Sequence, residues 1–183
     1  MLSKLTLVLG GAASGKTSFA ENLVKNEGAP MVYIATAQAL DDEMKARIAA
    51  HQAARGPGWQ VIEAPLDAAD ALHRAAADSV VLLDCATMWL SNQMGAGDDL
   101  HRARAALLDA LTGCAARVVV VSNELGQSVV PENALARRFR DAQGRLNQQI
   151  AARADLVVAV MAGLPLPLKG ALPQDAPHDG GAA

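Results

Sequence analysis

The stretch "LVLGGAASGKTSF", residues 7–19, joins a short run of apolar residues to a segment with helical character. Its spacing is G-x-x-x-x-G-K-[ST], with Gly10, Gly15, Lys16 and Thr17 at the fixed positions. Glycines let a backbone turn tightly and approach a ligand closely. The N–H groups of such a loop point into one concave space that suits phosphate oxygens, and the following helix adds its positive N-terminal end. The spacing therefore predicts a phosphate-binding loop between a strand and a helix.

Side chains in and near this loop predict a nucleotide with Mg²⁺. Lys16 would reach the β- and γ-phosphates, and the hydroxyl of Thr17 would hold the metal. Asp84 ends the apolar run "SVVLLD" and would assist Mg²⁺ directly or through water, although a plain strand-end or helix-capping aspartate is the alternative. Glu124, in "VSNELG", has two open interpretations. It orders the metal or accepts a hydroxyl proton, or it is a loop carboxylate bonded to nearby N–H groups.

Short apolar runs alternate with Ala-rich segments of helical period. "VVLLDC" and "RVVVVSN" are apolar at successive positions, which is typical of strands buried on both faces. We expect strands at residues 5–10, 31–35, 60–64, 79–84, 117–122 and 156–161, and helices at residues 16–26, 41–55, 68–77, 99–112 and 133–154. This alternation predicts an α/β fold with a mostly parallel sheet, helices on both faces, and ligands at the carboxyl ends of the strands.

The pattern stops at Gly163, where prolines and glycines become frequent. We expect residues 1–170 to form a single domain, in which residues 163–169 are an extended arm that packs on the domain or on a neighbouring subunit. Residues 171–183 are expected to be a disordered tail, because their Pro- and Gly-rich composition offers little to bury.

Composition restricts the classes of function. The chain has 183 residues, of which 51% are apolar and 3% aromatic, and a net charge of −3. That charge argues against a general nucleic-acid binder. Cys85 and Cys114 make neither a disulfide framework nor a metal-ligand spacing, and are expected to be small buried residues. No secretory leader opens the chain and no apolar run approaches the roughly 18 residues of a membrane span, so we expect a cytoplasmic protein.

The segment of residues 41–55, "DDEMKARIAAHQAAR", is unusual in its charged residues. Arg47, His51 and Arg55 follow one another at four-residue steps, so they share one face of a helix. Positive neighbours disfavour imidazolium, which biases His51 towards its neutral, nucleophilic form, and guanidinium groups hold phosphate well. A solvated face with a Glu43–Arg47 ion pair explains the same residues, and from the pattern alone it is the more frequent outcome.

Four segments together resemble one family, namely "GGAASGKTSFAE", "YIATAQALDDEMKARIAAHQAAR", "LLDCATMWLSN" and "VSNELGQSVVPENALARRFRDAQGRLNQQIAARAD". They are similar to the bifunctional adenosylcobinamide kinase / adenosylcobinamide-phosphate guanylyltransferase family of cobalamin biosynthesis. The likeness runs through "AGLPLPLK" near the end of the chain. The phosphate loop alone fits many families, whereas "RI-x-x-H-x-x-x-R" and "NE-x-G-x-x-x-VPEN" are far more specific.

The resemblance implies a P-loop NTPase-type (RecA-like) sheet, a homotrimer and two reactions. The first phosphorylates adenosylcobinamide with ATP or GTP. The second transfers GMP from GTP to adenosylcobinamide phosphate through a covalent histidine–GMP intermediate and releases pyrophosphate. The family's motif histidine falls on His51, with Lys16 as the other catalytic residue. The implied nucleotide contacts are Gly10, Gly11, Ala12, Ala13, Ser14, Gly15, Lys16, Thr17, Ala35, Thr36, Ala37, Gln52, Ala53, Ala54, Arg55, Glu63 and Asp84, and the implied metal contacts are Thr17 and Asp84.

The chain departs from the family pattern at two points. Many members place Pro directly after the arginine that matches Arg55, whereas Gly56 precedes Pro57 here, which changes the hinge after the helix. Some members carry Glu where Asp84 stands. Neither departure removes a reacting group. The nearest alternative is a P-loop small-molecule kinase without nucleotidyl transfer, with His51 as a surface residue. A nucleotide-switched ATPase or GTPase would need a large partner surface, for which the sequence offers no strong candidate.

Overall fold

The centre of the fold is one sheet of seven strands. They are β1 (Leu5–Gly10), β2 (Met31–Ala35), β3 (Trp59–Glu63), β4 (Val80–Asp84), β5 (Arg117–Asn123), β6 (Leu156–Met161) and β7 (Leu164–Lys169). Their order is β3-β2-β4-β5-β1-β6-β7, and β7 runs antiparallel to β6 while the other pairs are parallel. The structure is a computed structural model that describes residues 1–39, 42–97, 99–127, 129–174 and 176.

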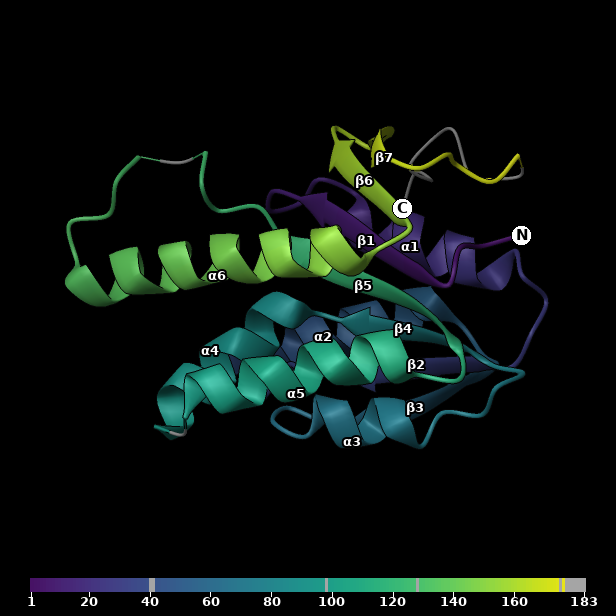
Figure 1. Cartoon of the computed structure of the whole chain (residues 1–183), viewed down its shortest axis with the longest axis horizontal. Coiled ribbons are helices and arrows are strands. Elements are labelled where there is room, and N and C mark those ends of the chain that lie inside the picture. The colour runs from purple at the N-terminus through teal and green to yellow at the C-terminus, as the bar shows by residue number, and fades with distance from the viewer. Residues whose placement is uncertain (40–41, 98, 128, 175, 177–183) are drawn as a thin grey trace.

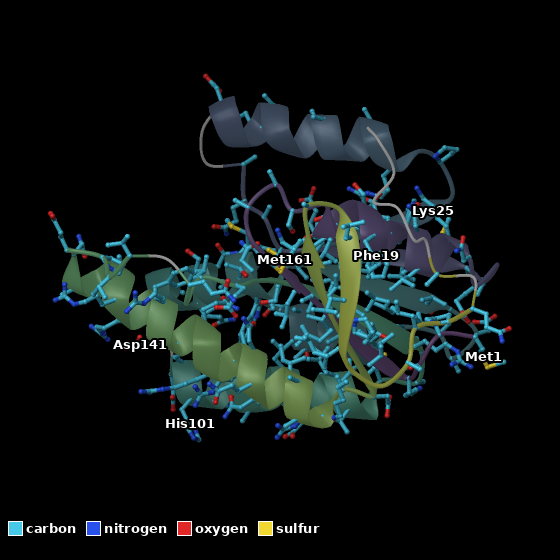
Figure 2. The ribbon with its side chains drawn as sticks, turned by 90° about the horizontal axis from the view of Figure 1, so that it is seen from above. Met1, Phe19, Lys25, His101, Asp141 and Met161 are labelled. Atoms are coloured by element: carbon cyan, nitrogen blue, oxygen red, sulfur yellow. The ribbon has the colours of Figure 1, made fainter. Side chains whose placement is uncertain are left out.

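Helices cover both faces of this sheet, as Figures 1 and 2 show. They are α1 (Lys16–Lys25), α2 (Asp42–Arg55), α3 (Ala68–His73), α4 (Ala86–Ala96), α5 (Leu100–Gly113) and α6 (Ala134–Arg153). α1 packs on one face, and α3, α4, α5 and α6 pack on the other. In Figure 2, α2 lies beyond α1 on the side away from the sheet. The predicted α/β fold, with a mostly parallel sheet and helices on both faces, is confirmed.

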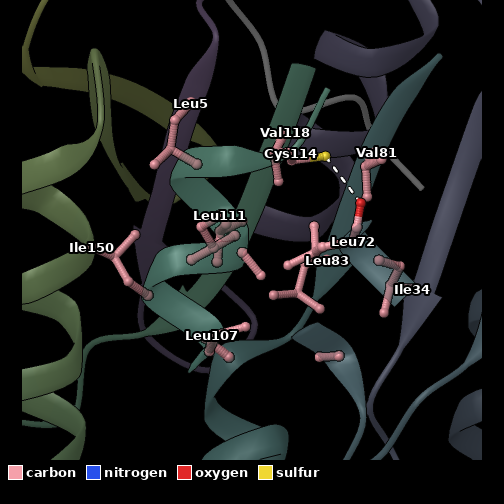
Figure 3. Packing of buried hydrophobic residues seen from close by; sticks show 14 of the residues in the cluster. Leu5, Ile34, Leu72, Val81, Leu83, Leu107, Leu111, Cys114, Val118 and Ile150 are labelled. Carbon is pink, nitrogen blue, oxygen red and sulfur yellow. Dashed lines mark hydrogen bonds between the residues drawn. The ribbon is translucent and has the colours of Figure 1, made fainter. Parts of the chain in front are cut away.

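The two faces of the sheet carry separate apolar clusters. Along β4, Val81 and Leu83 point into the cluster under α3 to α6, which Figure 3 shows, and Leu82 points into the cluster under α1. This alternation explains why the strand is apolar at successive positions, since both of its faces are buried. In the first cluster, Cys114 donates its Sγ–H to the carbonyl of Leu72 at 3.3 Å. Both cysteines are free and buried, as expected.

One helix, α4, is missing from the predicted elements. Its sequence "ATMWLSNQMGA" is apolar around much of its circumference, so it shows little amphipathic period. The reason is burial, because Trp89 and Leu90 are 1% and 0% exposed within the first cluster. α3 is also shorter than expected, since Arg74 caps it and the chain then turns into β4. No helix in the described part of the chain is both long and apolar enough to cross a lipid bilayer.

The expected extended arm is β7, an edge strand. It pairs with β6 so that Leu166 lies beside Ala159, and it alternates leucines with prolines. Leu164, Leu166 and Leu168 remain 60%, 54% and 58% exposed. Prolines are tolerated on an edge strand because one of its sides has no partner strand. Beyond β7, Ala176 is 4% exposed and lies in the cluster under α1, and most of the expected tail lies outside the described residues.

Candidate active site

The phosphate loop connects β1 to α1 and is held from two sides. Gly15, which caps α1, has a left-handed φ of 89°, which glycine adopts without strain. A Cβ on Gly10 would lie 2.7 Å from the backbone carbonyl oxygen of Val160, so a side chain at this position would force the backbone to shift. The N–H of Glu124 donates to the carbonyl of Gly10 at 3.1 Å, and the N–H of Gly163 donates to the carbonyl of Ser14 at 2.9 Å. The loop is therefore preformed.

Positive charge gathers at this loop. Lys16 donates its Nζ–H to the carbonyl of Gly11 at 3.0 Å, which keeps the ammonium group over the loop. The first turn of α1 carries no acidic residue, so nothing in that turn offsets the positive helix end. The hydroxyl of Ser14 is buried and has no hydrogen-bond partner within the described part of the chain. A phosphate oxygen would supply one, which agrees with the predicted role of the loop.

Asp84 lies at the carboxyl end of β4, where Tyr33 from β2 holds its side chain. The Tyr33 Oη–H donates to Asp84 Oδ2 at 2.8 Å. Burial, and next the Asp84 charge, raise the pKa of the Tyr33 phenol far above its ordinary value, so the phenol stays a hydrogen-bond donor. Burial and then Asp84 also raise the pKa of the Cys85 thiol to about 11, while Lys16 acts in the opposite direction. Lys16 and Asp84 thus both act on the same buried thiol.

Arg55, the last residue of α2, is buried rather than presented to solvent. It is 6% exposed, and its Cζ lies 3.3 Å from the centroid of the Tyr33 ring. Its Nε lies 3.7 Å from Glu21 Oε1 of α1. Burial raises the pKa of the Glu21 carboxyl, although Lys25 and Arg55 lower it. These contacts fasten the C-terminal end of α2 to β2 and to the helix of the phosphate loop.

The turn after β2 is fixed by hydrogen bonds to neighbouring elements. Thr36 is fully buried, and its Oγ1 accepts from the N–H of Cys85 at 2.7 Å and donates to the Cys85 carbonyl at 2.8 Å. Asn92 of α4 donates to the Thr36 carbonyl at 2.8 Å. In the sheet register, Ala35 lies between Glu63 and Asp84. Ala35, Glu63 and Asp84 therefore lie side by side at the carboxyl ends of their strands. Asn92 supports the turn at Thr36, and no sequence signal indicated this role.

A buried amide network fixes the segment after β5. The N–H of Asn123 donates to Thr87 Oγ1 at 2.8 Å, and Asn147 Nδ2 donates to the Asn123 carbonyl at 3.0 Å. Gln143 and Ser122 complete the network through Asn147 Oδ1, at 2.8 and 2.7 Å. The next residue along the chain is Glu124, the one bonded to the phosphate loop.

Glu124 itself makes a local contact. Its Oε1 accepts from the N–H of Gly126 at 2.6 Å, which is the contact expected of a loop carboxylate. This supports the second of its two interpretations for that oxygen. A carboxylate has lone pairs for further donors, so the contact does not decide between the two.

The predicted nucleophile lies on α2, whose backbone is described from Asp42 to Arg55. His51 precedes Arg55 by one turn of this helix. The side chains of His51, Arg47, Gln52 and Ala54 lie outside the described residues, so their roles stay predictions. Of the other predicted nucleotide contacts on this helix, Ala53 is exposed and Arg55 is engaged with Tyr33 and Glu21.

The donors available for a metal suit Mg²⁺. The described residues contain no group of three or more His, Cys, Asp or Glu that could hold a metal ion by itself. Mg²⁺ does not need such a cage, because it is usually bound by one or two side-chain oxygens, substrate phosphates and water. The Thr17 hydroxyl and the Asp84 carboxylate are oxygen donors of this kind, and both are half-buried at the same end of the sheet.

A likeness to a solved structure concerns the fold alone. The RadB recombinase superposes with a TM-score of 0.50 and 17% identity, over 96% of this chain and 83% of that one. This agrees with the predicted RecA-like, P-loop NTPase-type sheet, and the fold class is confirmed.

Sequence comparison identifies the family. The family model for cobinamide kinase / cobinamide phosphate guanyltransferase matches residues 6–168. The bifunctional adenosylcobalamin biosynthesis protein CobP of Pseudomonas aeruginosa is 47% identical over 167 residues, which covers 90% of this chain and 96% of the relative. The corresponding protein CobU of Escherichia coli is 38% identical over 181 residues, with 90% and 99% covered. The chain belongs to the cobinamide kinase / cobinamide phosphate guanyltransferase family and is a bifunctional transferase of cobalamin biosynthesis.

Proposed function

We propose that the chain carries out both reactions of its family around the phosphate loop, at the carboxyl edge of the sheet. It phosphorylates adenosylcobinamide with ATP or GTP. It then transfers GMP from GTP to adenosylcobinamide phosphate, giving adenosylcobinamide-GDP and pyrophosphate. The observation that carries the proposal is the loop from Gly10 to Thr17, which hydrogen bonds from two other segments hold in place. Lys16 lies over this loop, and Asp84 lies at the carboxyl end of β4, next to β5.

In the kinase step the chain supplies position and positive charge. The loop N–H groups and Lys16 hold the β- and γ-phosphates and stabilise the charge that develops on the transferred phosphoryl group. Thr17 and Asp84 would hold Mg²⁺, which neutralises phosphate charge when it is bound. The acceptor hydroxyl attacks the γ-phosphorus, the bond to the β-phosphate oxygen breaks, and the hydroxyl proton leaves to solvent or to a nearby carboxylate.

Guanylyl transfer needs attack further along the same nucleotide, at the α-phosphorus. We assign this attack to a ring nitrogen of His51, which forms an N–P bond while the bond to pyrophosphate breaks. A phosphate oxygen of adenosylcobinamide phosphate then attacks the same phosphorus, and the N–P bond breaks. Support comes from the contacts of Arg55, which attach the C-terminal end of α2 to β2 and α1 one turn from His51. Arg55 serves in this proposal to anchor the helix as well as to neutralise phosphate.

The test is covalent labelling with GTP that carries the label at the α-phosphorus. After denaturation, the unaltered protein should retain an acid-labile label, and His51→Ala should abolish both the label and guanylyl transfer while largely sparing the kinase. His101→Ala is the matched control, because His101 is exposed on α5, on the opposite face of the sheet. A label that persists in His51→Ala would place the nucleophile elsewhere. A complete lack of label with an active kinase would favour the small-molecule kinase without nucleotidyl transfer.

We also propose a homotrimer, in the cytoplasm, with no nucleic-acid partner. The support for association is the row of leucines on β7, which remains exposed in the single chain. Apolar patches of this kind commonly mark interfaces between chains.

A further inference from the structure

Tyr33 lies at the centre of a buried contact set shared by the proposed kinase and guanylyltransferase sites. It is 5% exposed, and its hydroxyl reaches Asp84 of β4. Arg55 of α2 covers one face of its ring, and the Trp59 ring meets it edge-on at a centroid distance of 5.8 Å. Arg55 in turn pairs with Glu21 of α1. One side chain thus contacts the elements that carry Asp84 and the predicted nucleophile.

Packing alone does not account for a tyrosine here. A phenylalanine would fill the same space between Arg55 and Trp59 and would keep both ring contacts. The hydroxyl adds a polar group that is costly to bury unless it forms a hydrogen bond. Its partner is a carboxylate at the end of a strand, and a hydrogen bond to a charged acceptor is shorter and stronger than one between neutral groups. The bond therefore restrains the direction of the Asp84 carboxylate.

We propose that Tyr33 is a positioning residue, which orients the Asp84 carboxylate towards the metal–nucleotide complex and ties it to the end of α2 through Arg55. The inference rests on the proposed metal role of Asp84. One carboxylate oxygen accepts from Tyr33, and a carboxylate has enough lone pairs to accept a metal or its water in addition. Without the hydroxyl, the carboxylate loses this restraint on its orientation, so it is held less firmly in the direction that suits the metal.

The experiment measures metal-dependent nucleotide binding in the absence of turnover. A non-hydrolysable GTP analogue is titrated calorimetrically into the full chain, once with Mg²⁺ and once with a chelator. Mg²⁺ should raise the affinity of the unaltered protein for the analogue. In Tyr33→Phe, this increase in affinity should be about tenfold smaller, as expected for a lost hydrogen bond to a charged group. Binding without metal should stay within about twofold of the unaltered protein, because the ring and its contacts remain.

Ser79→Ala is the matched control. Ser79 is 4% exposed and its Oγ–H donates to the Ala76 carbonyl at 2.6 Å, just before β4 and at the opposite end of that strand from Asp84. This variant also loses a buried hydroxyl hydrogen bond, so its loss of thermal stability should be similar to that of Tyr33→Phe. Mg²⁺ should raise its affinity for the analogue as much as it does in the unaltered protein. If Tyr33→Phe behaves like Ser79→Ala in both titrations, Tyr33 is a packing residue only and the inference is overturned.

Asp84→Asn separates this inference from the proposal on which it rests. If Asp84→Asn loses the effect of Mg²⁺ and Tyr33→Phe keeps it, the metal role of Asp84 stands and the role of Tyr33 is wrong. If Asp84→Asn keeps the effect, the metal role of Asp84 is wrong and the inference fails with it. If the unaltered protein does not bind the analogue under either condition, the proposed function itself is contradicted.

Discussion

The N–H of Gly163 donates a 2.9 Å hydrogen bond to the carbonyl of Ser14, which fastens the turn between β6 and β7 to the phosphate loop. The two segments also touch, since a Cβ built on Gly15 would lie 3.2 Å from Gly163 Cα. The loop that is expected to hold phosphate is therefore supported by residues about 150 positions later in the chain.

Gly15→Ala should destabilise the protein and weaken nucleotide binding. The new Cβ would meet Gly163 at a residue whose φ of 89° already disfavours a side chain. Gly28→Ala is the control, because Gly28 has a φ of 65° but no neighbour within 4 Å. We expect Gly28→Ala to cost about 1 kcal/mol of unfolding free energy and Gly15→Ala clearly more. Equal losses in denaturant unfolding, with unchanged nucleotide binding, would contradict the close contact.

Lys16→Ala should lower the kinase rate by roughly 100- to 1,000-fold, because it removes a charge that would face the β- and γ-phosphates. Lys4→Ala is the control. Lys4 precedes β1 at its other end and donates to the Ala115 carbonyl at 2.5 Å. Steady-state kinase assays should show Lys4→Ala close to the unaltered protein. Near-normal turnover in Lys16→Ala would remove Lys16 from the catalytic site.

Glu21 should make the stability of the protein depend on pH. Burial raises the pKa of its carboxyl above the ordinary value of 4.5. The unfolded chain therefore releases this proton at lower pH than the folded protein does, so the contribution of Glu21 to stability is greatest below pH 4.5 and declines as pH rises through the folded pKa. Glu21→Gln lacks this titration. Unfolding free energies of the two proteins, compared from pH 4 upwards, should diverge in favour of the variant; a constant difference would show that the carboxyl is not perturbed.

Asn147→Ala should loosen the segment that supports the phosphate loop. Asn147 is 5% exposed, and its loss removes the acceptor of the Ser122 hydroxyl and one hydrogen bond each from the Asn123 carbonyl and the Gln143 amide. An unsatisfied buried group costs about 1–3 kcal/mol, so we expect a loss of this size in unfolding free energy, together with a lower kinase kcat. Gln148→Ala, on the exposed side of the same helix, should change neither quantity. Full activity in Asn147→Ala would mean that the network serves the core alone.

Leu166→Lys should weaken the proposed trimer, because it places a charge among the exposed leucines of β7. Val61→Lys is the control, since Val61 is 45% exposed on β3, the strand at the other edge of the sheet. Sedimentation at micromolar concentration should give a smaller mass for Leu166→Lys than for Val61→Lys. If the unaltered chain sediments as a monomer, the trimer itself is refuted.

Much of the fold follows from local pattern. The phosphate-loop spacing and the alternation of strand and helix depend on neighbouring residues, and runs such as "VVLLDC" indicate burial on both faces without any knowledge of partners. The local pattern did not predict α4, because this helix is largely buried and lacks the polar face by which a surface helix is recognised. The strand order, in which β1 lies between β5 and β6, is a long-range property that no local window contains.

The site was predicted less completely, and Arg55 shows why. Helical spacing places it on one face with Arg47 and His51, and this suggested a phosphate ligand. Spacing does not reveal what that face meets, and the side chain packs on Tyr33 and Glu21. The bond between Tyr33 and Asp84 spans 51 positions, so it depends on the pairing of β2 with β4. Contacts of this kind follow only once the strand order is known.

The position of β1 between β5 and β6 has a consequence for newly made chains. The first strand leaves the ribosome early, but both of its neighbours, β5 and β6, begin more than 100 residues later in the sequence. The hydrogen bonds that hold the phosphate loop, from the N–H groups of Glu124 and Gly163, are therefore both present only after residue 163 has been synthesised. A nascent or prematurely terminated chain without β6 lacks these supports, so we expect it to bind nucleotide poorly.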